Sequence, residues 1–309
     1  MRVRFWGVRG SLPSPTRPNG ITLKLAEALA RARPEDIADG ASRRRFLASL
    51  PPWLRGTVGG NTPCTTVDIE GLGAPLIFDC GSGIREFGKA AVAEGAGAFH
   101  LFMSHFHWDH IEGLPFFGPA YDPAARIDFH SPDPAMETSF SDLMRRPYFP
   151  IGIADTAAAK RFNLMEGPLT LGPATISSRR MGHPDGSFAY RIDCAGRRFI
   201  YATDAELCAA DFAPSAPDFF AGADALVMDA QYTPAEAAEK SGWGHSSHGA
   251  AVEFAARWGI GHLVLFHHDP ESSDEKLYGM LRSARRYHRR AFARSMRISL
   301  AYEGMEIVL

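Results

Sequence analysis

Short apolar runs separated by turn residues recur along the chain and predict β-strands. The first run, residues 3–8, alternates apolar and polar positions and is closed by Gly10 and a proline-containing turn. Residues 65–69 and 75–78 are predicted to form a hairpin, and residues 99–104 a buried strand. The remaining predicted strands are 127–130, 169–177, 187–193, 198–202, 225–228, 262–266 and 298–302.

Apolar residues at helical spacing predict helices over 86–94, 234–240, 249–258 and 274–294. Residues 21–54, rich in Ala, Arg, Glu and Leu, predict two short helices broken near Pro34 and ended by Pro51 and Pro52. Residues 136–166 show no clear period. Because strands precede helices in blocks, we expect one layered α/β domain over residues 1–309, with mixed sheets, outer helices and a helical insertion at 15–57.

Composition narrows the class of protein. Of 309 residues, 45% are hydrophobic and 22% charged, which excludes a disordered or coiled-coil chain. A net charge of −2 argues against a surface built throughout for nucleic acid but leaves room for a local basic patch. No run reaches the roughly 18 apolar residues of a membrane span, and no signal peptide is readable, so we expect a cytoplasmic protein.

Cysteines and arginines have simple interpretations. Four cysteines without a C-x-x-C pair indicate reduced, buried thiols. The predicted C-terminal helix carries six arginines at spacings that form a positive stripe, which we interpret as a solvated face rather than a phosphate-binding surface. They are Arg282, Arg285, Arg286, Arg289, Arg290 and Arg294.

The strongest chemical feature is an H-x-H-x-D-H run directly after a predicted buried strand. His105 and His107 share one side of an extended backbone, and Asp109 and His110 follow. Three imidazoles and a carboxylate so close together suit Zn²⁺ or a similar metal ion. The isolated histidines His100, His130, His262 and His288 are instead expected to be packed or solvated.

Three later residues would complete two coordination spheres. His183, Asp204 and His267 each stand where a predicted strand gives way to a loop. Loops at strand ends bring residues distant in sequence to one edge of a sheet.

In this order, the residues resemble the metallo-β-lactamase superfamily across nearly the whole chain. The resemblance implies an αββα sandwich with two divalent metal ions at one edge, Zn²⁺ being expected and Mn²⁺ or Fe acceptable to the same ligands. His105, His107 and His183 would bind the first ion. Asp109, His110 and His267 would bind the second, and Asp204 would bridge the two. His267 is preferred to His268 because it matches the family's closing histidine.

Further motifs resemble one branch of that family. True β-lactamases typically lack a histidine at His110 and carry a cysteine at Asp204. The stretch 183–192 is similar to the H-x-x-x-S-x-x-Y-R stretch of the tRNA 3′-end nuclease RNase Z and of small cyclic phosphodiesterases. Gly244-His-Ser-Ser247 resembles an extra histidine motif of those phosphodiesterases. The glycine-containing stretches 7–11, 59–62 and 79–83 also resemble this branch, with Cys80 a departure from the usual Asp-Ala-Gly.

We therefore expect a metal-dependent hydrolase that cleaves a small cyclic or nucleotide-like phosphodiester through a hydroxide bridging the metals. Paired metal ions suit in-line displacement at phosphorus. Asp109 and His245 are the predicted catalytic residues. His245 would protonate the leaving oxygen, although it could instead be a loop histidine beside a capped helix.

Three other functions stay open. An RNase Z-like RNA-processing nuclease is the first, although the long basic arm typical of that enzyme is not readable in the sequence. A thioester or lactone hydrolase resembling glyoxalase II is the second. The third is a binding module that kept the fold without the chemistry.

Further residues have two interpretations each. Asp79 could accept a hydrogen bond from a metal-bound imidazole or cap the following helix. Arg9 and Asn61 could contact substrate or belong to turns. His248 and His268 could lie behind the metal ligands. The 15–57 insertion could be a lid or a homodimerisation element.

Overall fold

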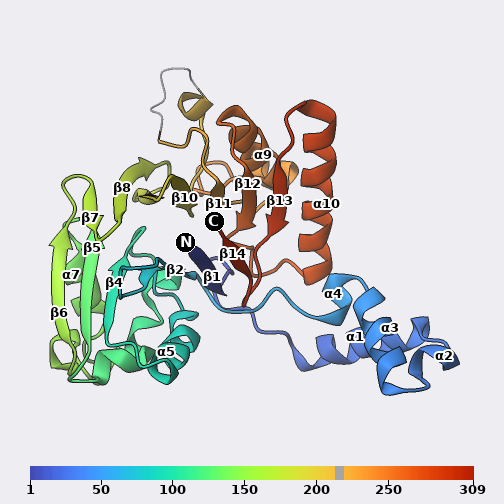
Figure 1. Cartoon of the computed structure of the whole chain (residues 1–309), viewed down its shortest axis with the longest axis horizontal. Coiled ribbons are helices and arrows are strands. Elements are labelled where there is room, and N and C mark those ends of the chain that lie inside the picture. The colour runs from blue at the N-terminus through green and yellow to red at the C-terminus, as the bar shows by residue number, and fades with distance from the viewer. Residues whose placement is uncertain (213–218) are drawn as a thin grey trace.

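The computed structural model describes residues 1–212 and 219–309. Two seven-stranded sheets form the body of the molecule, and helices lie outside them (Figure 1). The strand orders are β14-β1-β2-β3-β4-β5-β6 and β13-β12-β11-β10-β9-β8-β7. Both sheets mix parallel and antiparallel pairs, which confirms the predicted architecture.

The strands divide between the sheets at residue 165, except for the last. The first sheet contains β1 (Arg2–Gly7), β2 (Cys64–Asp68), β3 (Leu76–Phe78), β4 (Ala98–Phe102), β5 (Arg126–Ser131), β6 (Ala159–Leu164) and β14 (Glu306–Val308). The second contains β7 (Leu169–Leu171), β8 (Ala174–Met181), β9 (Ser187–Cys194), β10 (Arg197–Ala202), β11 (Ala225–Asp229), β12 (His262–Phe266) and β13 (Arg297–Leu300).

Helices connect and cover the sheets. They are α1 (Pro18–Arg31), α2 (Pro34–Ile37), α3 (Gly40–Ser49), α4 (Pro52–Arg55), α5 (Ile84–Ala93), α6 (Trp108–Ile111), α7 (Met136–Leu143), α8 (Pro234–Glu239), α9 (His248–Arg257) and α10 (Asp274–Ala291). Short 3₁₀ turns lie at Leu114–Phe116, Gly118–Tyr121, Ile153–Asp155 and Ala209–Phe212.

The main hydrophobic core lies between the two sheets. Phe78 of β3 contacts Tyr201 of β10 with ring centroids 5.5 Å apart, and Phe5 of β1 meets Phe266 of β12 at 5.9 Å. Such ring pairs contribute about 0.5–1.5 kcal/mol beyond the area they bury. A second core, under α5, lies on the other face of the first sheet. Burial on both faces explains why the central strands are continuous apolar runs.

Parallel strands place polar residues at one edge of the sandwich. In the second sheet, β10, β11 and β12 run parallel in adjacent positions, so their carboxyl ends lie together. Asp204, Asp229 and His267 stand at or just after these ends. In the first sheet, β3 and β4 are parallel, and they deliver Asp79 and the loop that begins at Ser104.

Some elements differ from the sequence-based expectation. Residues 169–177 form parts of two strands, β7 and β8, because the chain reverses at Gly172, which adopts a positive φ of 51°. The elements α7, β6 and β14 were not predicted. β6 mixes polar and apolar residues, all at least partly exposed, at the end of its sheet, so it gives no apolar run.

The insertion contains four helices rather than two. Pro34 and Pro52 each begin a helix instead of ending one, because proline fits the first turn, where its missing N–H has no partner to lose. The helices project from the body of the molecule (Figure 1). None of the residues of α1 is buried. The ends of the insertion meet where the Ser14 N–H donates to the Gly60 carbonyl at 2.7 Å.

Asp274, at the start of α10, anchors the insertion to the body. One of its carboxylate oxygens accepts a hydrogen bond from Lys24 Nζ of α1 at 2.5 Å. The other accepts from the Val58 N–H at 2.9 Å and from the Thr57 hydroxyl at 3.1 Å. Lys24 Nζ also donates to the Gly56 carbonyl at 2.7 Å, and the Arg31 guanidinium lies over the Trp53 ring, so α1 is attached to α4 as well.

Cysteine burial only partly matches the expectation. Cys64, Cys80 and Cys194 are free and buried, whereas Cys208 is free but exposed. Among the described helices, none has both the length and the apolar character needed to cross a membrane.

Candidate metal centre

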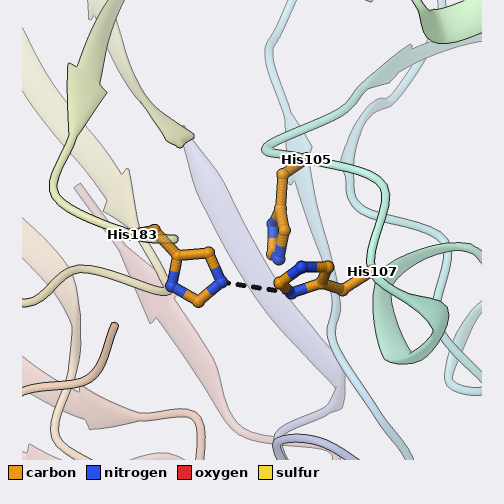
Figure 2. A group of neighbouring side chains, drawn as sticks. All are labelled: His105, His107 and His183. Atoms are coloured by element: carbon orange, nitrogen blue, oxygen red, sulfur yellow. Dashed lines mark hydrogen bonds between the residues drawn. The ribbon is translucent and has the colours of Figure 1, made fainter. Parts of the chain in front are cut away.

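Three histidines from two loops form the first part of a cluster. His105 and His107 lie on the loop after β4, and His183 lies on the loop after β8 (Figure 2). Their rings face a common space, and His183 Nε2 lies 3.1 Å from His107 Nδ1. Each residue offers one ligand atom, and these three atoms lie within 4.8 Å of one another.

A second group lies beside the first, with Asp204 between them. Asp109, His110 and His267 place their ligand atoms within 4.8 Å of one another. One oxygen of Asp204 faces His105 Nε2 at 3.8 Å. Its other oxygen lies 3.1 Å from His110 Nε2 and 3.2 Å from His267 Nε2. The seven residues expected from the sequence are therefore brought together at one edge of the sandwich.

The donor atoms of this cluster fit a divalent cation. The buried Nε2 atom of His105 has no hydrogen-bond partner among the described residues. A buried polar atom without a partner costs about 1–3 kcal/mol. The Nδ1 atoms, on the side of the rings away from the cluster, form hydrogen bonds with other groups. His183 Nδ1 lies 3.0 Å from the Gly244 carbonyl, and His105 Nδ1 lies 3.0 Å from the Ser104 hydroxyl. Metal-binding imidazoles characteristically have this arrangement.

Electrostatics favour the metal-binding protonation state of His105 and of Asp204. Burial, reinforced by the neighbouring imidazole of His110, holds the pKa of His105 well below its usual range, so this ring keeps a lone pair. Burial opposes ionisation of Asp204. The surrounding imidazoles of His267, His110 and His105 outweigh that effect and hold its pKa well below its usual range.

Backbone geometry also serves the cluster. Asp79, Asp204 and His267 adopt positive φ values of 60°, 48° and 58°, in the left-handed region that non-glycine residues avoid. Such residues cost of order 1–3 kcal/mol each and collect at functional sites. Position 244 accepts no residue other than glycine without a clash, because a Cβ there would lie 2.1 Å from His183 Nδ1.

Asp79 supports the cluster from behind. Its carboxylate accepts hydrogen bonds from His110 Nδ1 at 2.9 Å, from the Ser104 N–H at 2.7 Å and from the Tyr201 hydroxyl at 2.9 Å. The alternative role as a helix cap is not observed, since Gly83 occupies the cap position of α5 without a side-chain bond.

Sequence reasoning missed Asp229, the last residue of β11. It is fully buried, and its carboxylate lies 2.8 Å from His245 Nδ1 while accepting from the Ser246 N–H at 2.9 Å. Burial lowers the pKa of His245, but the charge and hydrogen bond of Asp229 outweigh burial and raise the pKa to about 9. The cap of α9 is Ser247, so His245 is free of that role. The signal for Asp229 was its place at the end of an apolar strand.

Four other residues singled out from the sequence lie outside the cluster. The Arg9 guanidinium donates to the carbonyls of Gly59, Asp269 and Ser272, at 2.8–3.1 Å, so it joins three loops; a substrate contact stays a prediction. The Asn61 side chain accepts from Ser82. His268 Nε2 bonds to the Ala301 carbonyl, and His248 packs beside the Tyr232 carbonyl at the start of α9.

The histidines expected to be structural are so. His100 Nδ1 and His130 Nε2 share a hydrogen bond at 3.1 Å. His262 Nε2 bonds to the Ser299 hydroxyl at 2.9 Å, and the ring of His288 stacks on Phe292.

An open pocket of about 440 Å³ lies beside the cluster. Its lining residues come from the body of the molecule: Ser11, Phe106, His107, Trp108, Asp109, Asp204, His245 and His267. The Ser11 N–H donates to Asp109 at 2.7 Å and fixes that carboxylate. No lining residue belongs to the insertion, so its role as a lid or a dimer element stays a prediction.

Comparison with known proteins agrees with the fold and the cluster. The family model described as the beta-lactamase superfamily domain matches residues 76–268. A ribonuclease Z of Synechococcus is 24% identical over 250 residues, covering 63% of this chain and 76% of the relative.

Two solved structures share the architecture over nearly their whole length. The metallo-β-lactamase fold protein YhfI of Bacillus subtilis superposes with a TM-score of 0.66 at 18% identity, covering 99% of this chain and 98% of that one. A diphosphatase of the PhnP family gives 0.63 at 17% identity, with coverage of 100% and 97%. The chain belongs to the metallo-β-lactamase superfamily and is a metal-dependent hydrolase.

Proposed function

We propose that the protein is a dinuclear metal-dependent phosphodiesterase acting on a small cyclic or nucleotide-like phosphodiester. The observation that carries the proposal is the position of Asp204, whose two oxygens face two separate groups of imidazoles. Two divalent ions, Zn²⁺ or alternatively Mn²⁺ or Fe, would supply Lewis-acid stabilisation of the phosphate and a nucleophile at neutral pH.

The chain would contribute the proton for the leaving group. His245 lines the pocket, and its Nδ1 is fixed by Asp229, which leaves Nε2 as the atom that can donate into the pocket. A carboxylate behind an imidazole both orients the ring and stabilises its protonated form. Protonation of the departing alkoxide oxygen by Nε2 would complete the cleavage.

The pocket also favours a substrate with an aromatic group. Trp108 lines it and is 77% exposed, an unusual state for so large an apolar ring. A nucleobase stacked on such a ring gains about 1–3 kcal/mol. Phe106 continues the same apolar wall.

A nuclease that processes RNA 3′ ends is the second candidate, and the similarity to the ribonuclease Z of Synechococcus favours it. The thioester or lactone hydrolase and the binding module have no such observation in their favour. An RNA substrate would place its terminal phosphodiester in the same pocket, so the two candidates differ in substrate length.

Metal content and cleavage of bis(p-nitrophenyl) phosphate, measured after chelation and again after adding Zn²⁺ or Mn²⁺, test the proposal. We expect about two metal ions per chain and chelator-sensitive cleavage. A panel of cyclic nucleotides, an RNA with a 3′ extension and a thioester then separates the candidates. Bound metal with cleavage of the thioester alone would contradict the proposal.

Trp108→Ala tests the aromatic wall. We expect KM for a cyclic nucleotide to rise about tenfold, with KM for a base-free cyclic glycerol phosphate unchanged. Trp243→Ala is the matched control, because Trp243 is exposed but does not line the pocket. Equal changes for both substrates would remove Trp108 from base recognition.

A further inference from the structure

A second cleft lies between the insertion and the C-terminal part of the chain. It has a volume of about 690 Å³ and is bounded by α4, α10, β13 and the turn before β14. In Figure 1, α4 lies at one end of α10, and β13 runs beside that helix. The cleft shares no lining residue with the pocket beside the His/Asp cluster.

Four exposed arginines from three different elements line this cleft. Arg55 comes from α4, Arg282 and Arg285 from α10, and Arg297 from β13. Within the described part of the chain, none of the four has a carboxylate within 4.0 Å. The acidic residue in the lining, Glu306, is already paired with an arginine outside the cleft at 2.8 Å.

Most of the donor capacity of these arginines is unused. Arg285 directs Nε and Nη2 to the Ile298 carbonyl, at 2.9 and 2.7 Å, which fixes the side chain while leaving Nη1. Arg55 makes one long hydrogen bond, 3.3 Å, to the Ala48 carbonyl. Guanidinium groups that face one hollow without counter-charges raise its positive potential and match phosphate oxygens in geometry.

The arginines of α10 are exposed, as expected for a solvated helix face, but they divide into two groups. Arg282 and Arg285 line the cleft, whereas Arg286, Arg289 and Arg290 of the same helix do not. Arginines of α4 and β13 line the same cleft as Arg282 and Arg285 of α10, which the spacing within one helix does not explain. The cleft is thus a concave site assembled by the tertiary fold.

Two tyrosines complete the lining. Tyr278 is half-buried on α10, and Tyr302, which follows β13, is 43% exposed. The volume falls in the range of small-ligand sites, about 300–1,000 Å³. Arginines for phosphates and aromatic rings for a base are the side chains that nucleotide ligands require.

We propose that this cleft is a binding site for a nucleotide carrying more than one phosphate, separate from the hydrolytic pocket. The phosphates lie against Arg282, Arg285 and Arg297, and the base packs against Tyr302. The proposal does not depend on the reaction catalysed at the His/Asp cluster.

The test compares ligand binding by the metal-loaded protein and two double variants, with inorganic pyrophosphate, ATP and adenosine as probes in isothermal titration calorimetry. In Arg282→Ala/Arg297→Ala, we expect affinity for ATP and pyrophosphate to fall about tenfold or more, since charge-assisted contacts are lost. Arg286→Ala/Arg289→Ala removes the same charge from α10 outside the cleft and is expected to leave affinity unchanged. Tyr302→Leu is expected to weaken ATP but not pyrophosphate.

Cleavage of bis(p-nitrophenyl) phosphate by all variants separates this proposal from the proposed function. We expect unchanged turnover, so failure of hydrolysis in every protein would reject the phosphodiesterase and leave the cleft intact. Equal loss of affinity in both double variants would overturn the cleft site in favour of general charge attraction. Binding of single-stranded RNA without binding of ATP or pyrophosphate would also overturn it.

Discussion

The edge that carries the His/Asp cluster and the helical insertion are held in opposite ways. At the edge, residues from separate strands are buried and linked: Asp79 alone accepts hydrogen bonds from three neighbours. In the insertion, α1 buries none of its residues, and its leucines Leu23, Leu25 and Leu29 are 60–69% exposed. The groups at the edge are fixed by a buried network, whereas most of α1 is exposed and is attached to the body through Asp274 and through α4.

This difference predicts where substitutions act. A substitution at the edge alters a connected hydrogen-bond network and therefore changes metal content or turnover. A change in the insertion alters a segment that contributes no residue to the pocket beside the cluster.

The largest effect is expected for Asp204→Ala. Loss of the carboxylate that faces both imidazole groups removes at least one metal ion and lowers turnover about a thousandfold. Elemental analysis and cleavage of bis(p-nitrophenyl) phosphate measure both. His262→Gln is the control, because this buried histidine lies at the opposite end of β12 from His267. Full metal content in Asp204→Ala would break the contrast at its strongest point.

The next effect concerns the proton donor. We expect His245→Ala and Asp229→Asn each to lower kcat about a hundredfold with metal content retained, since they disable one pair. The double variant should be little worse than either single one, because the two residues act as a unit. Steady-state kinetics with metal analysis decide, and multiplicative losses would show that the residues act separately.

A smaller effect concerns stability, and it arises from burial of a histidine, His130, that is not among the expected metal ligands. Burial, assisted by the adjacent ring of His100, lowers the pKa of His130 to about 4, while Asp128 opposes the shift. Between pH 6.5 and 4 the unfolded chain takes up a proton that the folded chain refuses, so the free energy of unfolding falls as pH falls. The slope is about 1.4 kcal/mol per pH unit for this group and is absent above pH 6.5.

Urea unfolding of the wild type and His130→Phe at pH 7 and 5 measures that slope. Phenylalanine preserves the ring stacked on Phe102 and cannot be protonated. We expect the variant to lose stability less steeply on acidification. Parallel curves for the two proteins would show that His130 is protonated equally in both states.

The smallest effect on chemistry is expected from deleting residues 21–54. The hydrogen bond between Ser14 and Gly60 and the cluster itself should persist, with metal content and turnover of bis(p-nitrophenyl) phosphate within about twofold of wild type. A change of substrate preference would identify the insertion as a lid. A monomer with unchanged kinetics, formed from a wild-type dimer, would identify a dimer element. Loss of metal would contradict the contrast itself.

The same contrast explains what the sequence could predict. Apolar runs gave the central strands because burial on both faces imposes such runs, and β12 matches its predicted bounds. The H-x-H-x-D-H run and residues at strand ends identified the groups that now lie together. The two-sheet architecture and the family were confirmed as well.

The features that the sequence did not predict depend on contacts between residues far apart in the chain. Asp229 is a lone carboxylate whose role appears only once His245 lies against it. Arg9 stands in a glycine-rich loop that suggested a substrate contact, but the loops around 59 and 270 supply three carbonyls to its guanidinium. The gathering of arginines from α4, α10 and β13 could not be read from the spacing within one helix.

The paired ends of the insertion have a consequence for the history and engineering of the chain. Because Ser14 and Gly60 are hydrogen-bonded neighbours, the segment between them leaves the body of the molecule and returns to it at the same place. Chain entropy makes long excursions from such a point only slightly more costly than short ones. The junction is therefore a site at which related hydrolases could carry different insertions. A foreign domain could be inserted there without changing either sheet.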